Sequence, residues 1–113
     1  MKILIVEDEK LSSDHLKTLL HKIDASISVI DSLESIKEFE AWNESSGSAD
    51  LILMDIHLAD GISFEIFEKY DIDIPIIFTT AYNEYAIKAF KVNSVDYLLK
   101  PIGLSDLNDA IEK

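Results

Sequence analysis

The sequence predicts an α/β protein with a doubly wound, five-stranded parallel sheet and five helices. Three observations predict this class. Short runs that are apolar on both faces recur along the chain, segments with helical spacing separate them, and no linker or low-complexity segment interrupts the alternation. A strand buried on both faces requires continuous apolarity, and repeated strand and helix alternation with right-handed crossovers places a parallel sheet between two helical layers.

Four apolar runs fit buried strands, and a fifth, weaker run fits an edge strand. The buried runs are residues 2–6 (KILIV), 51–54 (LILM), 75–78 (PIIF) and 97–99 (YLL), and the weaker run is 27–30 (ISVI). Runs this short are typical of strands, because a buried helix needs a longer apolar segment.

Amphipathic spacing predicts a helix after each strand. The first helix has its apolar stripe at i, i+3, i+4 and i+7, on Leu16, Leu19, Leu20 and Ile23. The other expected stripes are Leu33, Ile36 and Phe39, capped by Ser32; Phe64, Phe67 and Tyr70; Tyr82, Ala86, Ile87 and Phe90, capped by Asn83; and Leu104, Leu107 and Ile111, capped by Ser105. Asp106 would then lie at the positive end of the last helix dipole.

Composition limits the classes of function. The chain has 113 residues, enough for one domain with one core, and its 22 acidic and 10 basic residues give a formal charge of -12. Such a surface repels phosphate backbones, so we expect no direct binding of nucleic acid by this domain. The absence of cysteine excludes disulfides and thiolate metal sites. No apolar stretch approaches the ~20 residues needed to cross a membrane, so we expect a cytoplasmic protein.

Polar residues follow the predicted strands at their carboxyl ends, where open parallel sheets bind ligands. They are Glu7 and Asp8 after the first strand, Asp55 after the third, Thr79 and Thr80 after the fourth, and Lys100 and Pro101 after the fifth. Because the strands are parallel, we expect all of these side chains at one rim of the sheet.

The carboxylates at this rim predict a cation site. Glu7, Asp8 and Asp55 repel one another and raise one another's pKa values unless a positive charge lies among them. An all-oxygen set with few carboxylates suits Mg²⁺ better than Ca²⁺, and the calcium-loop spacing of EF-hands is absent. Lys100 and the Thr80 hydroxyl would neutralise and orient a phosphoryl group, and Asp55 would be the carboxylate that accepts it.

Four segments in order carry a resemblance to a known family. They are VEDE (6–9), LMDIHLADG (53–61), FTTAY (78–82) and DYLLKPI (96–102), and together they resemble the receiver domain of bacterial two-component response regulators over essentially the whole chain. Residues 78–102 look most like the LytTR-type regulators, in which a receiver precedes a DNA-binding domain. The resemblance implies a flavodoxin-like fold with strand order 2-1-3-4-5. No such DNA-binding domain follows Lys113, so we expect residues 1–113 to be a receiver domain separated from its effector.

The resemblance also implies a role for each site residue. Mg²⁺ would be held by Glu7, Asp8, Asp55 and the backbone carbonyl of His57. Asp55 would be phosphorylated, Thr80 would bind a phosphoryl oxygen, and Lys100 would pair with the phosphate. Tyr97 would be the switch aromatic, and the bond to Pro101 would be cis. General X-Pro statistics would instead favour a trans bond. The domain would not be an enzyme in its own right but a phospho-acceptor that catalyses its own phosphorylation and slow dephosphorylation.

Two departures from the family pattern affect the loop after Asp55. Ala59 and Asp60 stand where many receivers have a proline before the turn glycine, so we expect a looser loop. His57 and Tyr82 occupy the two positions that tune hydrolysis of the aspartyl phosphate in the family.

Two partners are expected. One is a sensor histidine kinase that meets the first helix near Leu11 and His15. The other is a second copy of the chain, bound on phosphorylation through the face formed by the fourth helix, fifth strand and fifth helix. That face carries Tyr85, Lys88, Lys91, Asp96 and Asp109.

Plainer interpretations stay open for several residues. Glu7 and Asp8 are alternatively caps of the first helix, Lys100 a solvated surface charge, and Tyr97 a packing aromatic. We interpret Thr79 as an ordinary strand residue, His15 and His21 as surface residues, and Asp31 as a turn or cap residue. Two other function classes remain: a receiver-like interaction module that is never phosphorylated, and a phosphatase of the haloacid-dehalogenase kind. The phosphatase pattern places D-x-D after the first strand, whereas Asp55 lies mid-chain.

Overall fold

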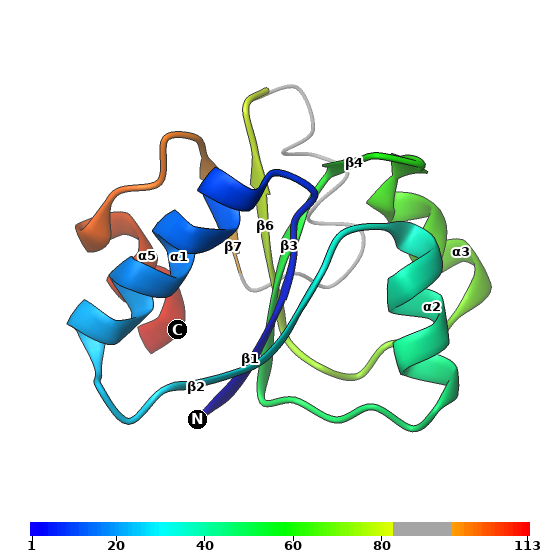
Figure 1. Cartoon of the computed structure of the whole chain (residues 1–113), viewed down its shortest axis with the longest axis horizontal. Helices are drawn as coiled ribbons and strands as arrows, with labels where there is room; N and C mark the ends of the chain where they lie inside the picture. Colours follow the sequence, from blue (N-terminus) through cyan, green and yellow to red (C-terminus); the bar gives the residue numbers. More distant parts are fainter. Residues whose placement is uncertain (83–95) are drawn as a thin grey trace.

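A computed structural model describes residues 1–82 and 96–113, and its centre is a five-stranded parallel sheet (Figure 1). The strands are β1 (Lys2–Val6), β2 (Ser28–Leu33), β3 (Leu51–Asp55), β6 (Ile76–Thr80) and β7 (Asp96–Leu99). Their order is β2-β1-β3-β6-β7, and every neighbouring pair is parallel. The labels β4 (His57–Leu58) and β5 (Gly61–Ile62) belong to a separate antiparallel hairpin. The predicted fold class and the order 2-1-3-4-5 are therefore confirmed.

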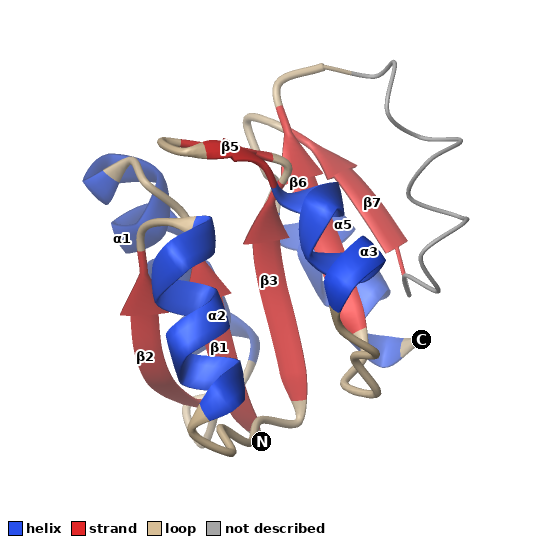
Figure 2. Cartoon of the chain, turned by 90° about the vertical axis from the view of Figure 1, so that its right-hand side faces the viewer, coloured by secondary structure: helices blue, strands red, loops and turns tan. Residues whose placement is uncertain are grey.

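Helices cover both faces of the sheet (Figures 1 and 2). One face carries α1 (Lys10–Ile23) and α5 (Leu104–Glu112), and the other carries α2 (Ile36–Glu44) and α3 (Ile66–Lys69), which a 3₁₀ turn at Ser63–Glu65 precedes. The described residues thus hold four α-helices rather than the five predicted. The predicted fourth helix, with Asn83 as its cap, lies outside the described residues apart from Tyr82.

Two apolar cores lie on opposite faces of the sheet because side chains alternate along each strand. In β1, Ile3 and Ile5 pack with α1 and α5, whereas Leu4 and Val6 pack with α2 and α3. These four side chains are fully buried. The continuous apolarity of residues 2–6 therefore reports a strand buried on both faces, as the sequence predicts.

The N-terminus predicted for the second helix is wrong by three residues. β2 pairs with β1 as far as Val6 and Leu33, so Ser32 lies in a strand and does not cap a helix. The N-cap is Ser35, whose Oγ accepts a hydrogen bond from the Glu38 N–H at 3.0 Å. Asp31 also lies in β2, where its carboxylate accepts from the Ser32 N–H, so it is neither a turn nor a cap residue.

Ser105 is likewise not a cap. It lies inside α5, whose N-cap is Gly103, and Leu104 is 43% exposed rather than directed inward. Leu107 and Ala110 are the buried residues of this helix. In the third helical segment the fully buried residue is Ile66, and Tyr70 follows the last turn as the C-cap.

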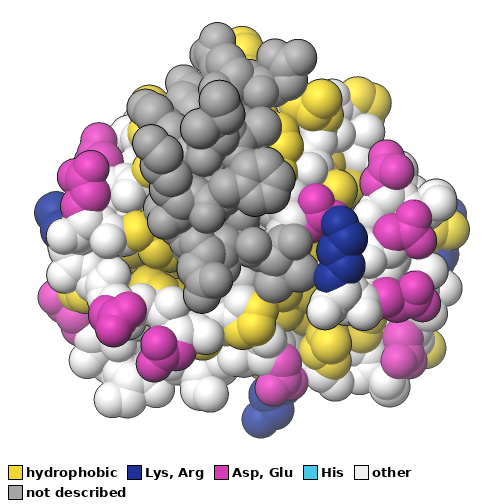
Figure 3. Space-filling view, turned by 180° about the vertical axis from the view of Figure 1, so that it is seen from behind, with side chains coloured by type: hydrophobic (Ala, Val, Ile, Leu, Met, Phe, Trp, Pro, Cys, Tyr) yellow, Lys and Arg dark blue, Asp and Glu magenta, His cyan; other side chains and the backbone are white. Residues whose placement is uncertain are grey.

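The surface agrees with the acidic composition. In Figure 3, acidic side chains are spread over the described part of one face, with isolated lysines between them. None of the helices that the structure describes is both long enough and apolar enough to span a bilayer.

Candidate metal centre

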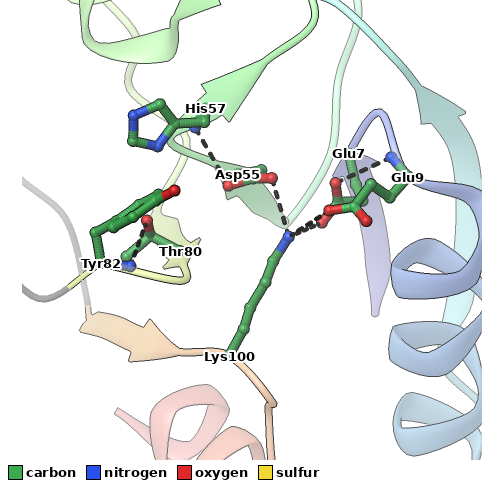
Figure 4. Close-up of polar contacts among 7 residues, drawn as sticks. All are labelled: Glu7, Glu9, Asp55, His57, Thr80, Tyr82 and Lys100. Atoms are coloured by element: carbon green, nitrogen blue, oxygen red, sulfur yellow. Dashed lines mark hydrogen bonds and ion pairs between the residues drawn. The ribbon is translucent and has the colours of Figure 1, made fainter.

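The carboxyl ends of β1, β3, β6 and β7 bring the predicted polar residues to one rim. Strand register sets this arrangement, because Val6 lies beside Met54, Asp55 beside Thr79, and Thr80 beside Leu99. The side chains at the ends of these strands therefore lie close together at one edge of the sheet, as Figure 4 shows.

Glu7, Asp8 and Asp55 form a compact cluster of carboxylates. One oxygen from each lies within 4.8 Å of the other two, and Glu7 and Asp55 are only 2% and 4% exposed. Opposite ligands of an octahedral Mg²⁺ are about 4.2 Å apart, since each lies about 2.1 Å from the ion. Small adjustments of these side chains would let one ion contact all three oxygens, and the all-oxygen donor set suits Mg²⁺. The residues present therefore fit this ion.

Lys100 supplies the positive charge among the carboxylates. Its Nζ donates to Glu7 Oε1 at 2.6 Å and to Asp55 Oδ2 at 3.0 Å, and Glu9 Oε1 lies 3.8 Å away (Figure 4). The lysine side chain is only 19% exposed. Lys100 is therefore an integral part of the cluster and not a solvated surface charge.

The ionisation of this cluster reflects its burial. Burial raises the pKa of the Glu7 carboxyl to about 7; the hydrogen bond from Lys100 opposes the shift, and nearby Asp55 reinforces it. Burial also disfavours the charged form of Lys100, but its hydrogen bonds to Glu7 and Asp55 outweigh this effect and raise its pKa. The site thus concentrates more negative charge than one lysine neutralises, which favours a divalent cation.

Backbone groups orient two of the carboxylates. The Glu9 N–H donates to Glu7 Oε2 at 3.1 Å, and the His57 N–H donates to Asp55 Oδ1 at 3.2 Å. Glu9 is the N-cap of α1 and makes no side-chain capping bond. The alternative that Glu7 and Asp8 cap this helix is therefore not supported. Glu9 was not among the predicted site residues, although its place next to Glu7 and Asp8 in VEDE was a signal.

Thr80 and Tyr97 are connected through the backbone of Tyr82. Thr80 is fully buried, and its Oγ1 accepts a hydrogen bond from the Tyr82 N–H at 3.2 Å. The Tyr97 hydroxyl donates to the Tyr82 carbonyl oxygen. One peptide segment therefore joins the two residues expected to act as a switch, and Tyr97 has a polar contact as well as packing contacts.

Two aromatic rings stand beside the acidic cluster. The His57 and Tyr82 rings pack edge to face with centroids 5.0 Å apart, and both line a hollow of about 350 Å³ that Asp55 and Lys100 also line. Thr79 is buried in β6, as its interpretation as a strand residue predicts. The peptide bond from Lys100 to Pro101 is cis, as the resemblance implies.

The loop after Asp55 pairs with itself and contacts α2. Residues His57–Leu58 and Gly61–Ile62 form the β4–β5 hairpin, and the Asp60 carboxylate binds the first two N–H groups of α2. Contacts with residues 24 and 23 positions away along the chain therefore hold this loop. This role of Asp60 was not predicted, because the position of the helix that donates to it follows only from the tertiary fold.

Comparison with known proteins shows one family. The family model described as the response regulator receiver domain matches residues 3–112. Among curated proteins, the chain is 37% identical to "Sensory transduction protein LytR" of Staphylococcus epidermidis and 38% identical to "Sensory transduction protein LytT" of Enterococcus faecalis. All of this chain is covered in both cases, but only 45% and 47% of those proteins, so the chain spans about half of their length.

Solved structures give the same result. The response regulatory domain of protein mrkE from Klebsiella pneumoniae superposes with a TM-score of 0.85 at 25% identity, covering 99% of this chain and 93% of that chain. A CheY-like response regulator receiver domain protein from Methanospirillum hungatei JF-1 gives a TM-score of 0.80 at 27% identity, with 98% and 90% covered.

Proposed function

Because this chain belongs to the family of response regulator receiver domains, and its relatives include LytR and LytT, we propose that it is a signalling switch activated by phosphorylation of Asp55. Receiver domains are signalling domains rather than classical enzymes, they bind Mg²⁺ at an acidic pocket, and they work with a sensor histidine kinase and an effector. One observation carries the proposal: Lys100 Nζ lies 3.0 Å from Asp55 Oδ2, within a buried cluster that Glu7 and Asp8 complete.

The chemical step that we propose is phosphoryl transfer from a phosphohistidine to Asp55. An Asp55 oxygen forms a bond to phosphorus while the bond from phosphorus to the imidazole nitrogen breaks, and that nitrogen takes up a proton. Lys100 is placed to neutralise the charge that develops on the phosphoryl oxygens, and Thr80 to donate a hydrogen bond to one of them. Mg²⁺ held by Glu7, Asp8, Asp55 and the His57 carbonyl would supply further charge neutralisation.

The hydrogen bonds of Thr80 support a specific switch. A phosphoryl group adds about -1.5 to -2 charges beside the rim, which attract the Thr80 hydroxyl. When Thr80 moves toward them, its Oγ1 leaves the Tyr82 N–H, and the Tyr82 carbonyl that holds Tyr97 moves in turn. Tyr97, in β7, would then change its position. To convert a minor active state into the dominant one, these contacts must favour it by about 3 to 5 kcal/mol.

We place the kinase at α1, on the side of the rim next to Lys100. A hollow of about 360 Å³ opens there, lined by Leu11, His15 and Ile102 among others. Leu11 is 85% exposed, and His15 Nε2 is 2.9 Å from the Ile102 carbonyl oxygen. An apolar side chain this exposed beside a phospho-acceptor supports a docking role for this surface.

We assign output to the surface formed by β7 and α5. Asp96 binds Lys113 at 2.9 Å, and these residues line a hollow of about 430 Å³ together with Leu99 and Asp109. Leu99 is 47% exposed. The other residues expected at this face, Tyr85, Lys88 and Lys91, lie outside the described residues. We propose that phosphorylation promotes homodimerisation here, and unchanged sedimentation after addition of beryllofluoride and Mg²⁺ would contradict this.

The output of the longer protein is also a proposal. The Staphylococcus aureus relative is called "Transcriptional regulatory protein LytR", and this chain spans 46% of its length. We propose that the switch controls a DNA-binding effector domain and that the receiver itself binds no DNA and no membrane. We propose a cytoplasmic location, where a kinase and an effector can both reach the domain.

Phosphorylation by a small donor tests the central proposal. Incubation with acetyl phosphate and Mg²⁺ should add one phosphoryl group, measured as intact mass. Asp55→Asn should abolish the addition, and Asp71→Asn, which changes an exposed acid before β6, should not. No uptake by the wild type would favour a receiver-like interaction module, and steady release of phosphate from monoesters would favour a phosphatase.

A further inference from the structure

The β4–β5 hairpin carries the backbone of the candidate metal centre. It begins two residues after Asp55, pairs His57 with Ile62 and Leu58 with Gly61, and turns through Ala59 and Asp60. The His57 N–H contacts Asp55, and the His57 carbonyl is the proposed fourth Mg²⁺ ligand. Because an isolated two-stranded hairpin is at best marginally stable, its position must come from contacts outside it.

Asp60 makes the polar contacts that fix this hairpin to α2. Its Oδ1 accepts from the Ile36 N–H at 2.8 Å, and its Oδ2 accepts from the Lys37 N–H at 3.1 Å. Ser35 binds the next free amide, that of Glu38. The first turn of α2 thus has two separate caps, one from the hairpin and one from the chain that leads into the helix.

Gly61 allows the hairpin to approach α2 this closely. Its φ is 145°, a conformation that side chains other than glycine rarely adopt, and a Cβ there would lie 3.3 Å from Ile36 Cδ1. Leu58 and Ile36 are both buried in the same apolar core. Polar and apolar contacts therefore hold the hairpin against the same end of α2.

We propose that Asp60 is a positioning residue for the divalent ion, because its carboxylate clamps the hairpin to α2 and thereby fixes the His57 backbone beside Asp55. This inference rests on the proposed Mg²⁺ site. Mg²⁺ requires near-ideal octahedral geometry, so a displaced carbonyl ligand weakens binding even when the acidic ligands are intact. By linkage, the ion must also strengthen the contact between Asp60 and α2.

Isothermal titration calorimetry of the 113-residue chain with Mg²⁺ tests the positioning role of Asp60. Asp60→Ala should weaken binding about tenfold, as loss of groups that orient ligands typically does. Asp60→Asn removes the same charge but keeps one acceptor oxygen, so it should recover part of the affinity. Ser35→Ala is the matched control, because it removes the other cap of α2 without touching the hairpin, and it should leave the affinity unchanged.

A second readout reports the linkage directly. In amide NMR spectra, Mg²⁺ should shift the Ile36 and Lys37 resonances in the wild type and in Ser35→Ala, but not in Asp60→Ala. A purely structural cap would make Asp60→Ala and Ser35→Ala behave alike. A long-range charge effect would make Asp60→Asn and Asp60→Ala alike.

The outcomes separate the two proposals. If the wild type binds Mg²⁺ and Asp60→Ala binds it equally well, the positioning role is wrong and the proposed function stands. If the wild type binds no Mg²⁺, the proposed metal site is wrong, and the role of Asp60 is wrong with it. Should Asp60→Ala fail to fold, the comparison of Asp60→Asn with Ser35→Ala decides the inference in the same way.

Discussion

Replacing the proposed phospho-acceptor should stabilise the ion-free protein. Asp55 is 4% exposed and shares one lysine with Glu7, while Asp8 lies in the same cluster. Asp55→Asn removes one negative charge from this group and keeps the side-chain shape. The amide oxygen of the variant side chain can still accept from the His57 N–H, and Lys100 can pair fully with Glu7.

The size of this effect follows from the distances. At a pH above 7, where Glu7 is ionised, and with an effective dielectric constant of about 20, repulsion of Asp55 by an acid 4.8 Å away is about 3.5 kcal/mol, and two acids lie within that distance. Attraction to Lys100 at 3.0 Å is about 5.5 kcal/mol. Removing the Asp55 charge therefore stabilises the folded protein by roughly 1.5 kcal/mol. The lower desolvation cost of a neutral side chain adds to this stabilisation. For a domain of this size, such a change raises Tm by roughly 5 to 10 °C.

Thermal unfolding followed by circular dichroism, with EDTA and with saturating Mg²⁺, measures this change. In EDTA the variant should unfold at the higher temperature. With Mg²⁺ the wild type should gain more stability than Asp55→Asn, because the variant has lost a ligand. A variant that is less stable than the wild type in EDTA would refute the conclusion that the cluster carries excess negative charge.

Three further changes test other parts of the structure. Lys100→Met should lower the free energy of unfolding in EDTA by about 3 kcal/mol, because Glu7 loses its buried partner. Urea titration should also show that Mg²⁺ stabilises this variant more than it stabilises the wild type. Equal stability of the two proteins without the ion would contradict this expectation. The pH dependence of Asp60 has a defined sign: desolvation raises its pKa, but the hydrogen bonds from the α2 backbone outweigh this and leave the pKa below 3.8. Its stabilising effect is therefore complete above the pKa of the unfolded chain, and the difference in Tm between the wild type and Asp60→Ala should shrink as the pH falls below 3.8; a constant difference would show that the charge of Asp60 is irrelevant. Gly47→Ala should lower the free energy of unfolding by about 2 kcal/mol, because the added Cβ would overlap the Trp42 indole. Urea unfolding monitored by the fluorescence of this single tryptophan can measure the change. An unchanged urea midpoint would contradict the packing of Gly47 against Trp42.

The sequence predicts the layers and the rim because both depend on local patterns. A strand buried on both faces requires continuous apolarity, so residues 2–6 and 51–54 were recognisable without a structure. Parallel strands end at one edge, so the residues after them had to meet. These two rules were enough to predict that Glu7, Asp55 and Lys100 lie together, and the structure places them in contact.

The errors occur where tertiary contacts outweigh local preferences. Ser32 has the chemistry of a cap, but pairing with β1 extends β2 through it, and the helix begins only after Ser35. The pattern S-x-x-E from Ser35 to Glu38 is typical of a capping box and would have located this N-terminus. No local pattern identifies Asp60 as a cap of α2, because the N–H groups that donate to it belong to a helix that precedes it in the sequence.

The arrangement of Thr80 and Lys100 explains how one added group would move a surface outside the site. The Lys100 N–H donates to the Thr80 carbonyl oxygen at 2.7 Å, so the backbones on either side of the proposed phosphoryl position are joined directly. Lys100 already has its ammonium at Asp55, whereas the Thr80 hydroxyl is engaged with Tyr82. A Thr80 side chain that turns its O–H toward a phosphoryl oxygen would move its Oγ1 away from the Tyr82 N–H, and that contact leads to Tyr97. Since a ligand shifts an equilibrium only through contacts that differ between two states, we expect the signal to leave the rim through Thr80 rather than Lys100.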